Sequence, residues 1–159
     1  MAIYMKIPAI EGDISAQGHE HWIQILNLEF STKRSLSIEP GRIADREATR
    51  PAISEVLIYK KMDKASPLLF SEACVGKAKN EVKIDICQTG SSLMPYMQYT
   101  LGNVIISSYS VEAENDAYPK EKLHLSFDRI EMRYTPFDEQ NQAQSPIPAG
   151  YDLRKATTI

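Results

Sequence analysis

YMQYTLGNVIISSYSV (96–111) and LHLSFDRIEMRYTPFD (123–138) are the stretches that decide the fold class of this chain. In 96–111 apolar side chains recur at positions of one parity, and polar side chains occupy positions of the other. The apolar set is Met97, Tyr99, Leu101, Ile105, Tyr109 and Val111. This alternation is typical of half-buried strands in antiparallel sheets. Because the run is long for one strand, we expect it to bend or to serve two sheets.

The alternation changes phase in two other stretches. In 123–134 the apolar residues change from odd positions (Leu123, Leu125, Phe127) to even positions (Ile130, Met132, Tyr134). One extra residue would keep both sets on the core side, so we predict a β-bulge near Asp128 and Arg129. A similar change follows Ile25. Bulges bend a sheet toward closure, which favours a small β-barrel of two antiparallel sheets, or a tightly curled sandwich, over a flat sheet.

One short helix is predicted to start within MDKASPLLF (62–70). Ser66 is a good N-cap, Pro67 suits the first helical position, and Gly76 supplies the stop. At about nine residues the helix is too short to be stable alone. It must therefore flank the barrel, and the pairs spaced for one face are Leu69 with Ala73 and Phe70 with Cys74.

Residues 31–52 and 138–150 are expected to be irregular. The first stretch is polar and contains Pro40-Gly41 and Pro51. It is longer than ~12–15 residues, and loops of that length are usually functional or disordered. Its alternating charges are Glu39, Arg42, Asp45, Arg46, Glu47 and Arg50. Two interpretations stay open: a solvated loop, or a docking arm whose mixed charges meet a complementary surface on a second copy of the chain.

Composition points to one globular domain over 1–159. The net charge of −3 argues mildly against a nucleic-acid partner. No run approaches the ~18 apolar residues that span a bilayer, so membrane insertion is not expected. The start lacks a signal-peptide pattern, so we expect a cytoplasmic protein unless a route without a signal peptide exports it. The two cysteines, Cys74 and Cys87, are expected to be free thiols.

Patterns that would indicate catalysis or cofactor binding are weak. His19 and His21 would share a face on a strand, but His124 is remote and no further ligand is placed to complete a metal site. We expect both histidines at a solvated strand start. Nucleophile and phosphate-binding motifs are absent from the sequence. We therefore predict no catalytic, cofactor-binding or metal-binding residues, and no enzyme activity.

Over essentially its full length the chain resembles the Hcp family, the haemolysin-coregulated proteins that form the inner tube of the bacterial type VI secretion system. The resemblance rests on the order and spacing of several segments. They are MAIYMKIP (1–8), GHEHWIQILNL (18–28), DKASP (63–67), 99–109, 125–136 and GYDL (150–153). His21, directly before Trp22, departs from the family pattern, in which a smaller residue is expected.

The resemblance implies a β-barrel with one flanking helix that assembles into homohexameric rings. Rings would stack into a tube inside a contractile sheath, capped by a valine-glycine-repeat spike protein. Contraction would expel the tube, and effectors would travel in its lumen. On this basis residues 38–50, with the six charges named above, are candidates for ring stacking. Candidates for a polar face that lines either the lumen or the outside are Gln98, Thr100, Ser108, Ser126, Asp128 and Glu131.

A second function class is a monomeric β-barrel that binds a small ligand in the barrel mouth. Long loops and mixed charge fit this alternative, whereas the family resemblance does not. The oligomeric state separates the two, because a binding barrel need not form rings.

Overall fold

A computed structural model describes residues 1–36, 40, 49–90 and 93–159. It has twelve strands and one helix, α1 (Ser66–Val75). The strands are β1 (Ala2–Lys6), β2 (Ile23–Ile25), β3 (Asn27–Glu29), β4 (Thr32–Lys33), β5 (Ala52–Ile53), β6 (Val56–Lys61), β7 (Lys79–Cys87), β8 (Pro95–Glu112), β9 (Lys120–Ser126), β10 (Arg129–Tyr134), β11 (Ile147–Asp152) and β12 (Thr157–Thr158). This mainly-β architecture with one short helix confirms the predicted fold class.

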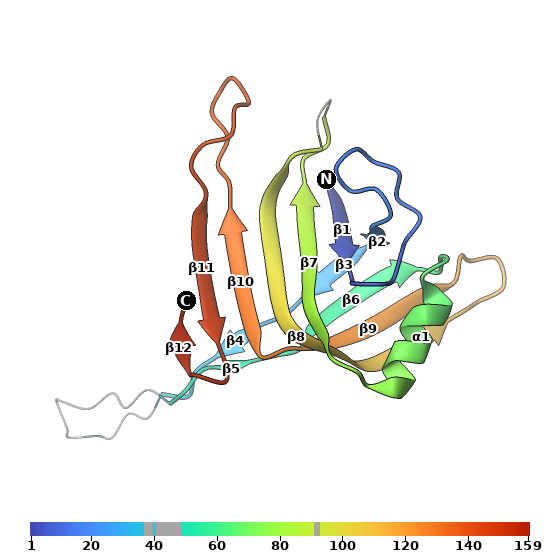
Figure 1. The fold of residues 1–159 in the computed structure, drawn as a ribbon, viewed down its shortest axis with the longest axis horizontal. Helices are drawn as coiled ribbons and strands as arrows, with labels where there is room; N and C mark the ends of the chain where they lie inside the picture. The colour runs from blue at the N-terminus through green and yellow to red at the C-terminus, as the bar shows by residue number, and fades with distance from the viewer. Residues whose placement is uncertain (37–39, 41–48, 91–92) are drawn as a thin grey trace.

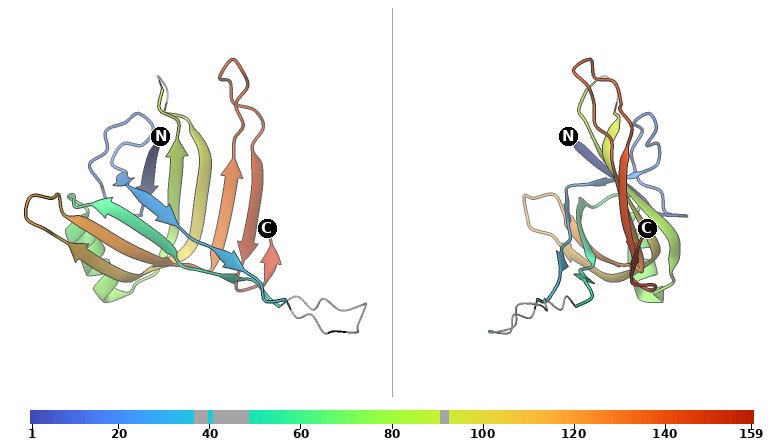
Figure 2. Two further views of the ribbon diagram at one scale, coloured as in Figure 1. Left: turned by 180° about the vertical axis from the view of Figure 1, so that it is seen from behind. Right: turned by 90° about the vertical axis from the view of Figure 1, so that its left-hand side faces the viewer.

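Two antiparallel sheets pack over one core, and they share the long strand β8. The first sheet has the order β12-β11-β10-β8-β7-β1-β2, and in the second sheet β9 pairs with β8 and β6, and β6 with β3. Strands of the second sheet cross those of the first steeply (Figures 1 and 2). The 18 residues of β8 pair with β7 and β10 in one sheet and with β9 in the other, so the prediction that this stretch serves two sheets is confirmed.

The phase changes occur where the chain passes from one sheet to the other. Arg129 pairs with Gly102 and Ser126 with Ile105, so two residues lie between the pairs on each strand and neither strand gains a residue there. The predicted bulge near Asp128 and Arg129 is therefore wrong. The strand is interrupted at 127–128 instead, opposite Asn103, whose φ of 53° is tolerated better by asparagine than by most residues.

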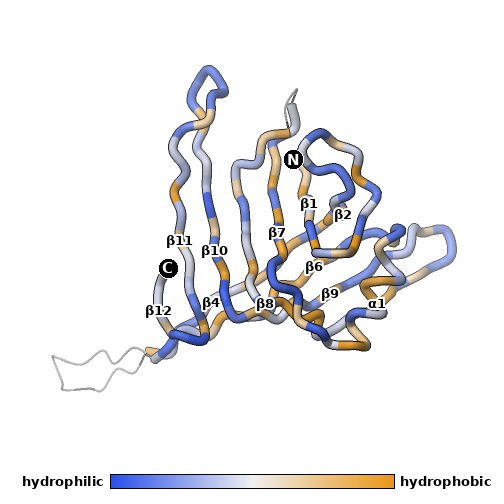
Figure 3. Tube along the Cα trace, in the orientation of Figure 1, coloured by the Kyte–Doolittle hydropathy of each residue, from blue (hydrophilic) through white to orange (hydrophobic). Residues whose placement is uncertain are grey.

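A bulge does occur in β8, between Ile106 and Ser108. The turnover near Asn103 also changes which side chains of β8 face the core. Leu101 is fully buried as predicted, but Ile105 is 36% exposed, whereas Val104 and Ile106 are buried. The prediction that Ile105 shares the face of Leu101 is wrong, because the strand turns over between them. Along β7, hydrophobic and hydrophilic residues alternate as expected for a strand with one face on the core (Figure 3).

Helix α1 lies against the sandwich with Leu69 fully buried, and Gly76 ends it in the left-handed conformation at φ 68°. The N-cap is Ala65, and Ser66 is the first helical residue, so the predicted cap was wrong by one residue. Phe70 and Cys74 were predicted to face the core but are exposed. Only the Leu69 side of the predicted pairing packs inward, with Ala73 at its edge.

The two stretches predicted to be irregular contain strands. Within 31–52, β4 pairs with β5, and Ser35 and Thr49 are joined by hydrogen bonds, so the described base of this arm is a hairpin. Within 138–150, β11 begins at Ile147 and pairs with β10 over six residues. Pro148 lies where β12 does not reach, and a proline is tolerated at such an open edge.

Candidate functional site

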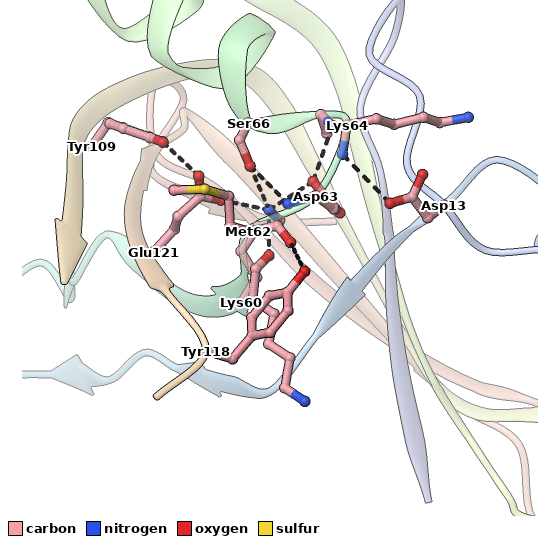
Figure 4. Close-up of polar contacts among 11 residues, drawn as sticks. Asp13, Lys60, Met62, Asp63, Lys64, Ser66, Tyr109, Tyr118 and Glu121 are labelled. Atoms are coloured by element: carbon pink, nitrogen blue, oxygen red, sulfur yellow. Dashed lines mark hydrogen bonds and ion pairs between the residues drawn. The ribbon is translucent and has the colours of Figure 1, made fainter. Parts of the chain in front are cut away.

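A buried polar cluster lies beneath the start of α1 (Figure 4). The Lys60 side chain is fully buried, and its Nζ donates to Lys61 O at 2.8 Å, Asp63 Oδ1 at 2.9 Å and Glu121 Oε2 at 2.5 Å. Ser66 Oγ lies 3.4 Å from the same Nζ. A buried ammonium with this many acceptors is stable only because each of its N–H groups is satisfied.

The same cluster connects the start of α1 to β8, the strand that the two sheets share. Asp63 Oδ1 also accepts from the backbone N–H of Ala65 at 3.0 Å, and Ser66 Oγ accepts from the backbone N–H of Asp63 at 3.0 Å. On the other side, the Tyr109 hydroxyl of β8 donates to Glu121 Oε1. Burial, followed by this contact with the Glu121 carboxylate, raises the pKa of Tyr109 far above its ordinary value. The DKASP segment therefore fixes α1 to β6, β8 and β9.

A second polar cluster contradicts the prediction for His19. This side chain is buried, not solvated, and lies between the rings of Tyr4 and Trp22. Its Nε2 is 2.9 Å from Asp85 Oδ2 and 3.7 Å from Cys87 Sγ. His21 is exposed and adopts a φ of 66° in the loop before β2, so the two histidines do not share a strand face.

The His19 cluster has the residue types of a nucleophilic triad but not its geometry. In a triad one ring nitrogen faces the nucleophile and the other faces the acid. Here Nε2 faces both Asp85 and Cys87, while Nδ1 is buried without a partner among the described residues. Burial, with the nearby Asp85 charge, raises the pKa of the Cys87 thiol to about 11, so the thiolate needed for attack is scarce at neutral pH. Across the described part of the chain, no three His, Cys, Asp or Glu side chains are arranged to hold a metal ion.

The six predicted polar-face residues lie in three places. Gln98, Thr100 and Glu131 share the outer face of the first sheet, where they border a hollow of about 460 Å³ together with Lys83 and Arg133. The remaining three lie elsewhere. Ser108 and Ser126 belong to the strands of the second sheet, and Asp128 lies at the crossing between the sheets, where it accepts from Asn103 at 2.8 Å and faces Arg154 at 3.6 Å.

Of the predicted stacking charges, Arg50 is described and exposed. The other five lie outside the described residues: Glu39, Arg42, Asp45, Arg46 and Glu47.

The described residues leave two apolar surfaces uncovered, one over α1 and one near β5, β10 and β11, at opposite ends of the ribbon (Figure 1). At one end is the outward face of α1, here called the helix face, made of Pro67, Leu68, Phe70, Ser71, Cys74 and Val75. At the other end is a groove of about 290 Å³, here called the apolar groove. Its main apolar lining is Phe30, Ile53, Ile130, Met132, Ala149 and Tyr151. The sequence patterns did not reveal either surface, and two residues of the helix face, Phe70 and Cys74, were predicted to pack against the barrel.

The fold and these sites define a β-sandwich protein with one flanking helix and uncovered apolar surfaces. Residues 4–134 match the model of the family described as type VI secretion system effector, Hcp. Since the match spans most of the 159 residues, the chain belongs to the Hcp family of type VI secretion system proteins, which confirms the resemblance seen in the sequence.

Solved structures support the same assignment of the fold. A type six secretion system protein superimposes with a TM-score of 0.93 at 22% identity, with 99% of each chain covered. Hcp1 from Salmonella typhimurium gives 0.81 at 22% identity over 99% of this chain and 98% of the other. A type VI secretion system effector from Yersinia pestis gives 0.74 at 25% identity over 94% and 98%. A comparison with curated protein sequences finds no match. In the described part of the chain, no helix is long and apolar enough to cross a membrane.

Proposed function

We propose that the chain is a structural subunit of the type VI inner tube, which forms homohexameric rings that stack. The observation that carries this proposal is the family match over residues 4–134. The two uncovered apolar surfaces support it, because a head-to-tail contact between different surfaces closes into a ring when its rotation divides the circle. Such a contact needs on the order of 1,000 Å² of buried surface to be stable.

The outer face of the first sheet is the proposed lumen wall. Its polar side chains include both signs of charge, with Lys83 and Arg133 beside Glu81 and Glu131, and neutral polar groups at Gln98 and Thr100. A polar surface of balanced charge would let a folded effector pass without strong adhesion. Residues 38–50, which lie between β4 and β5, are proposed to contribute to ring stacking. The spike protein and the contractile sheath are the further partners of this function.

The interior offers less support for the alternative, a small ligand in the barrel mouth. Between the sheets, side chains such as Ile58, Leu101 and Leu123 are fully buried and pack into one continuous core. The space that a ligand would need inside the sandwich is therefore occupied by the protein itself.

Export tests this function directly. The protein should appear in the culture medium of intact cells that carry the complete secretion apparatus, with the protein in the cytoplasm before firing. Deletion of the sheath gene should remove it from the medium while the amount inside the cells stays the same. A cytoplasmic marker protein, absent from both media, controls for lysis. Equal release with and without the sheath would contradict the proposal.

A further inference from the structure

We propose that the outward face of β6 and β9 is a docking surface for an acidic polypeptide segment, whose carboxylates bind three lysines on this face. The surface, here called the basic face, consists of Lys61, Lys120 and Lys122 with the rings of Tyr59 and Tyr118. It shares no residue with the helix face or the apolar groove. The inference goes beyond the tube function.

The three lysines lie on the side of the second sheet that faces away from the core. Strands β6 and β9 are neighbours in this sheet (Figure 1). Lys60 of β6 and Glu121 of β9 point to the core, where they are buried and bind each other. Because side chains alternate along a strand, Lys61, Lys120 and Lys122 point to the opposite side. The first two are exposed and Lys122 is half-buried. The buried carboxylate of Glu121 therefore does not neutralise them.

Positive charge is concentrated on the basic face. Lys61 and Lys120 are directly opposite each other on the paired strands, and like charges at such positions repel. Glu112 of β8 is opposite Lys120 on the other side. Among the described residues, however, no Asp or Glu oxygen lies within 4.0 Å of the Nζ atoms of Lys61, Lys120 and Lys122. The face thus carries net positive charge although the whole chain carries −3, and an anionic partner would remove the repulsion.

Two tyrosine rings position the lysine side chains before a ligand binds. The Nζ of Lys61 is 5.5 Å from the centre of the Tyr118 ring, and the Nζ of Lys122 is 5.5 Å from the centre of the Tyr59 ring. The Tyr118 hydroxyl donates to the backbone oxygen of Met62 at 3.2 Å, which fixes that ring. An ammonium is attracted to the face of an aromatic ring, so these lysines lose less conformational freedom when they bind a carboxylate.

The spacing of the lysines fits an extended acidic segment. Lys120 and Lys122 are two residues apart on one strand, a separation of about 6.6–6.8 Å. Carboxylates at alternate positions of an extended peptide have the same separation, so two of them can bind both lysines at once. A nucleic acid is favoured less, because its affinity depends on the number of phosphates neutralised, and three lysines neutralise few.

A labelled peptide tests the basic face. The probe is a fluorescein-labelled peptide of alternating glutamate and threonine, and the control peptide has glutamine in place of every glutamate. Fluorescence anisotropy with the purified full chain should show binding of the glutamate peptide and no binding of the glutamine peptide. Raising the ionic strength from about 0.05 M to about 0.5 M should weaken the binding several-fold, because exposed charges are screened by salt.

The face variant combines Lys61→Gln, Lys120→Gln and Lys122→Gln. It should bind the glutamate peptide about tenfold more weakly or worse, because three exposed ion pairs are lost. None of the three residues is buried, so the thermal unfolding midpoint should stay within a few degrees of the parent protein. Light scattering should give the mass of the parent for this variant, which shows that the change in binding does not come from a change in assembly.

The control variant combines Lys6→Gln, Lys77→Gln and Lys155→Gln, three exposed lysines outside the basic face. Both variants lose the same amount of positive charge, so any difference between them reports the location of the lysines. The control variant should weaken binding less than about threefold, because charges beyond the screening length contribute little.

No binding of the glutamate peptide, equal binding of the glutamine peptide, or equal weakening in the two variants would overturn the inference. An oligothymidylate that binds the parent more tightly than the peptide, and is lost from the face variant, would also overturn it by assigning the face to nucleic acid. None of these outcomes bears on the proposed tube function, which the export experiment tests separately.

Discussion

Lys60→Ala is expected to lower the free energy of unfolding by about 3–5 kcal/mol, the largest effect of any single substitution considered for this protein. The substitution removes the cation and leaves the carboxylates of Glu121 and Asp63 in place, one of them fully buried. An uncompensated buried charge costs more than the ion pair itself contributes. Urea denaturation followed by circular dichroism measures the loss.

The adjacent residue supplies the control for Lys60. The exposed Lys61 places its Nζ 5.5 Å from the Tyr118 ring, so Lys61→Ala should cost about 1 kcal/mol or less. A loss below 1 kcal/mol at neutral pH would show that the cluster does not fix the helix in solution.

The second large effect is expected on β8, from Leu101→Ala compared with Ile105→Ala. Leu101 is fully buried, so its truncation should cost about 2–5 kcal/mol through lost burial and a cavity. Ile105 has the same parity in the sequence but is 36% exposed, so its truncation should cost about 1 kcal/mol or less. The same urea titration measures both. Equal losses would mean that the strand does not turn over between the two positions.

The long strands β8, β9 and β10 and the helix were predictable because their patterns are local. Alternation in 96–111 and 123–134 and the Pro67–Gly76 signals depend only on neighbouring residues. The turnover of β8 was not predictable, because it depends on the pairing of Asn103 with the interrupted segment 127–128 across two strands. The hairpin at the base of the arm was missed for the same reason, since β4 and β5 lie far apart in sequence.

The polar sites were harder to predict than the fold. Asp85 occupies a polar position of β7, which alternation assigns to solvent, yet the loop before β2 covers it with His19. Lys60 is likewise the last buried residue of β6, and its burial depends on Glu121, which is 61 residues away in sequence. Lysine and glutamate are rarely buried unless they are paired, so the pairing in space had to be known before the burial could be expected.

The measurement that tests the central claim most directly is the mass and symmetry of the purified protein, from light scattering and negative-stain electron microscopy of one sample. A tube subunit should give six-fold rings and a mass six times 17.9 kDa, about 107 kDa. Rings that then join into longer tubes at higher concentration would agree with stacking. A uniform 17.9 kDa monomer without rings would contradict the claim.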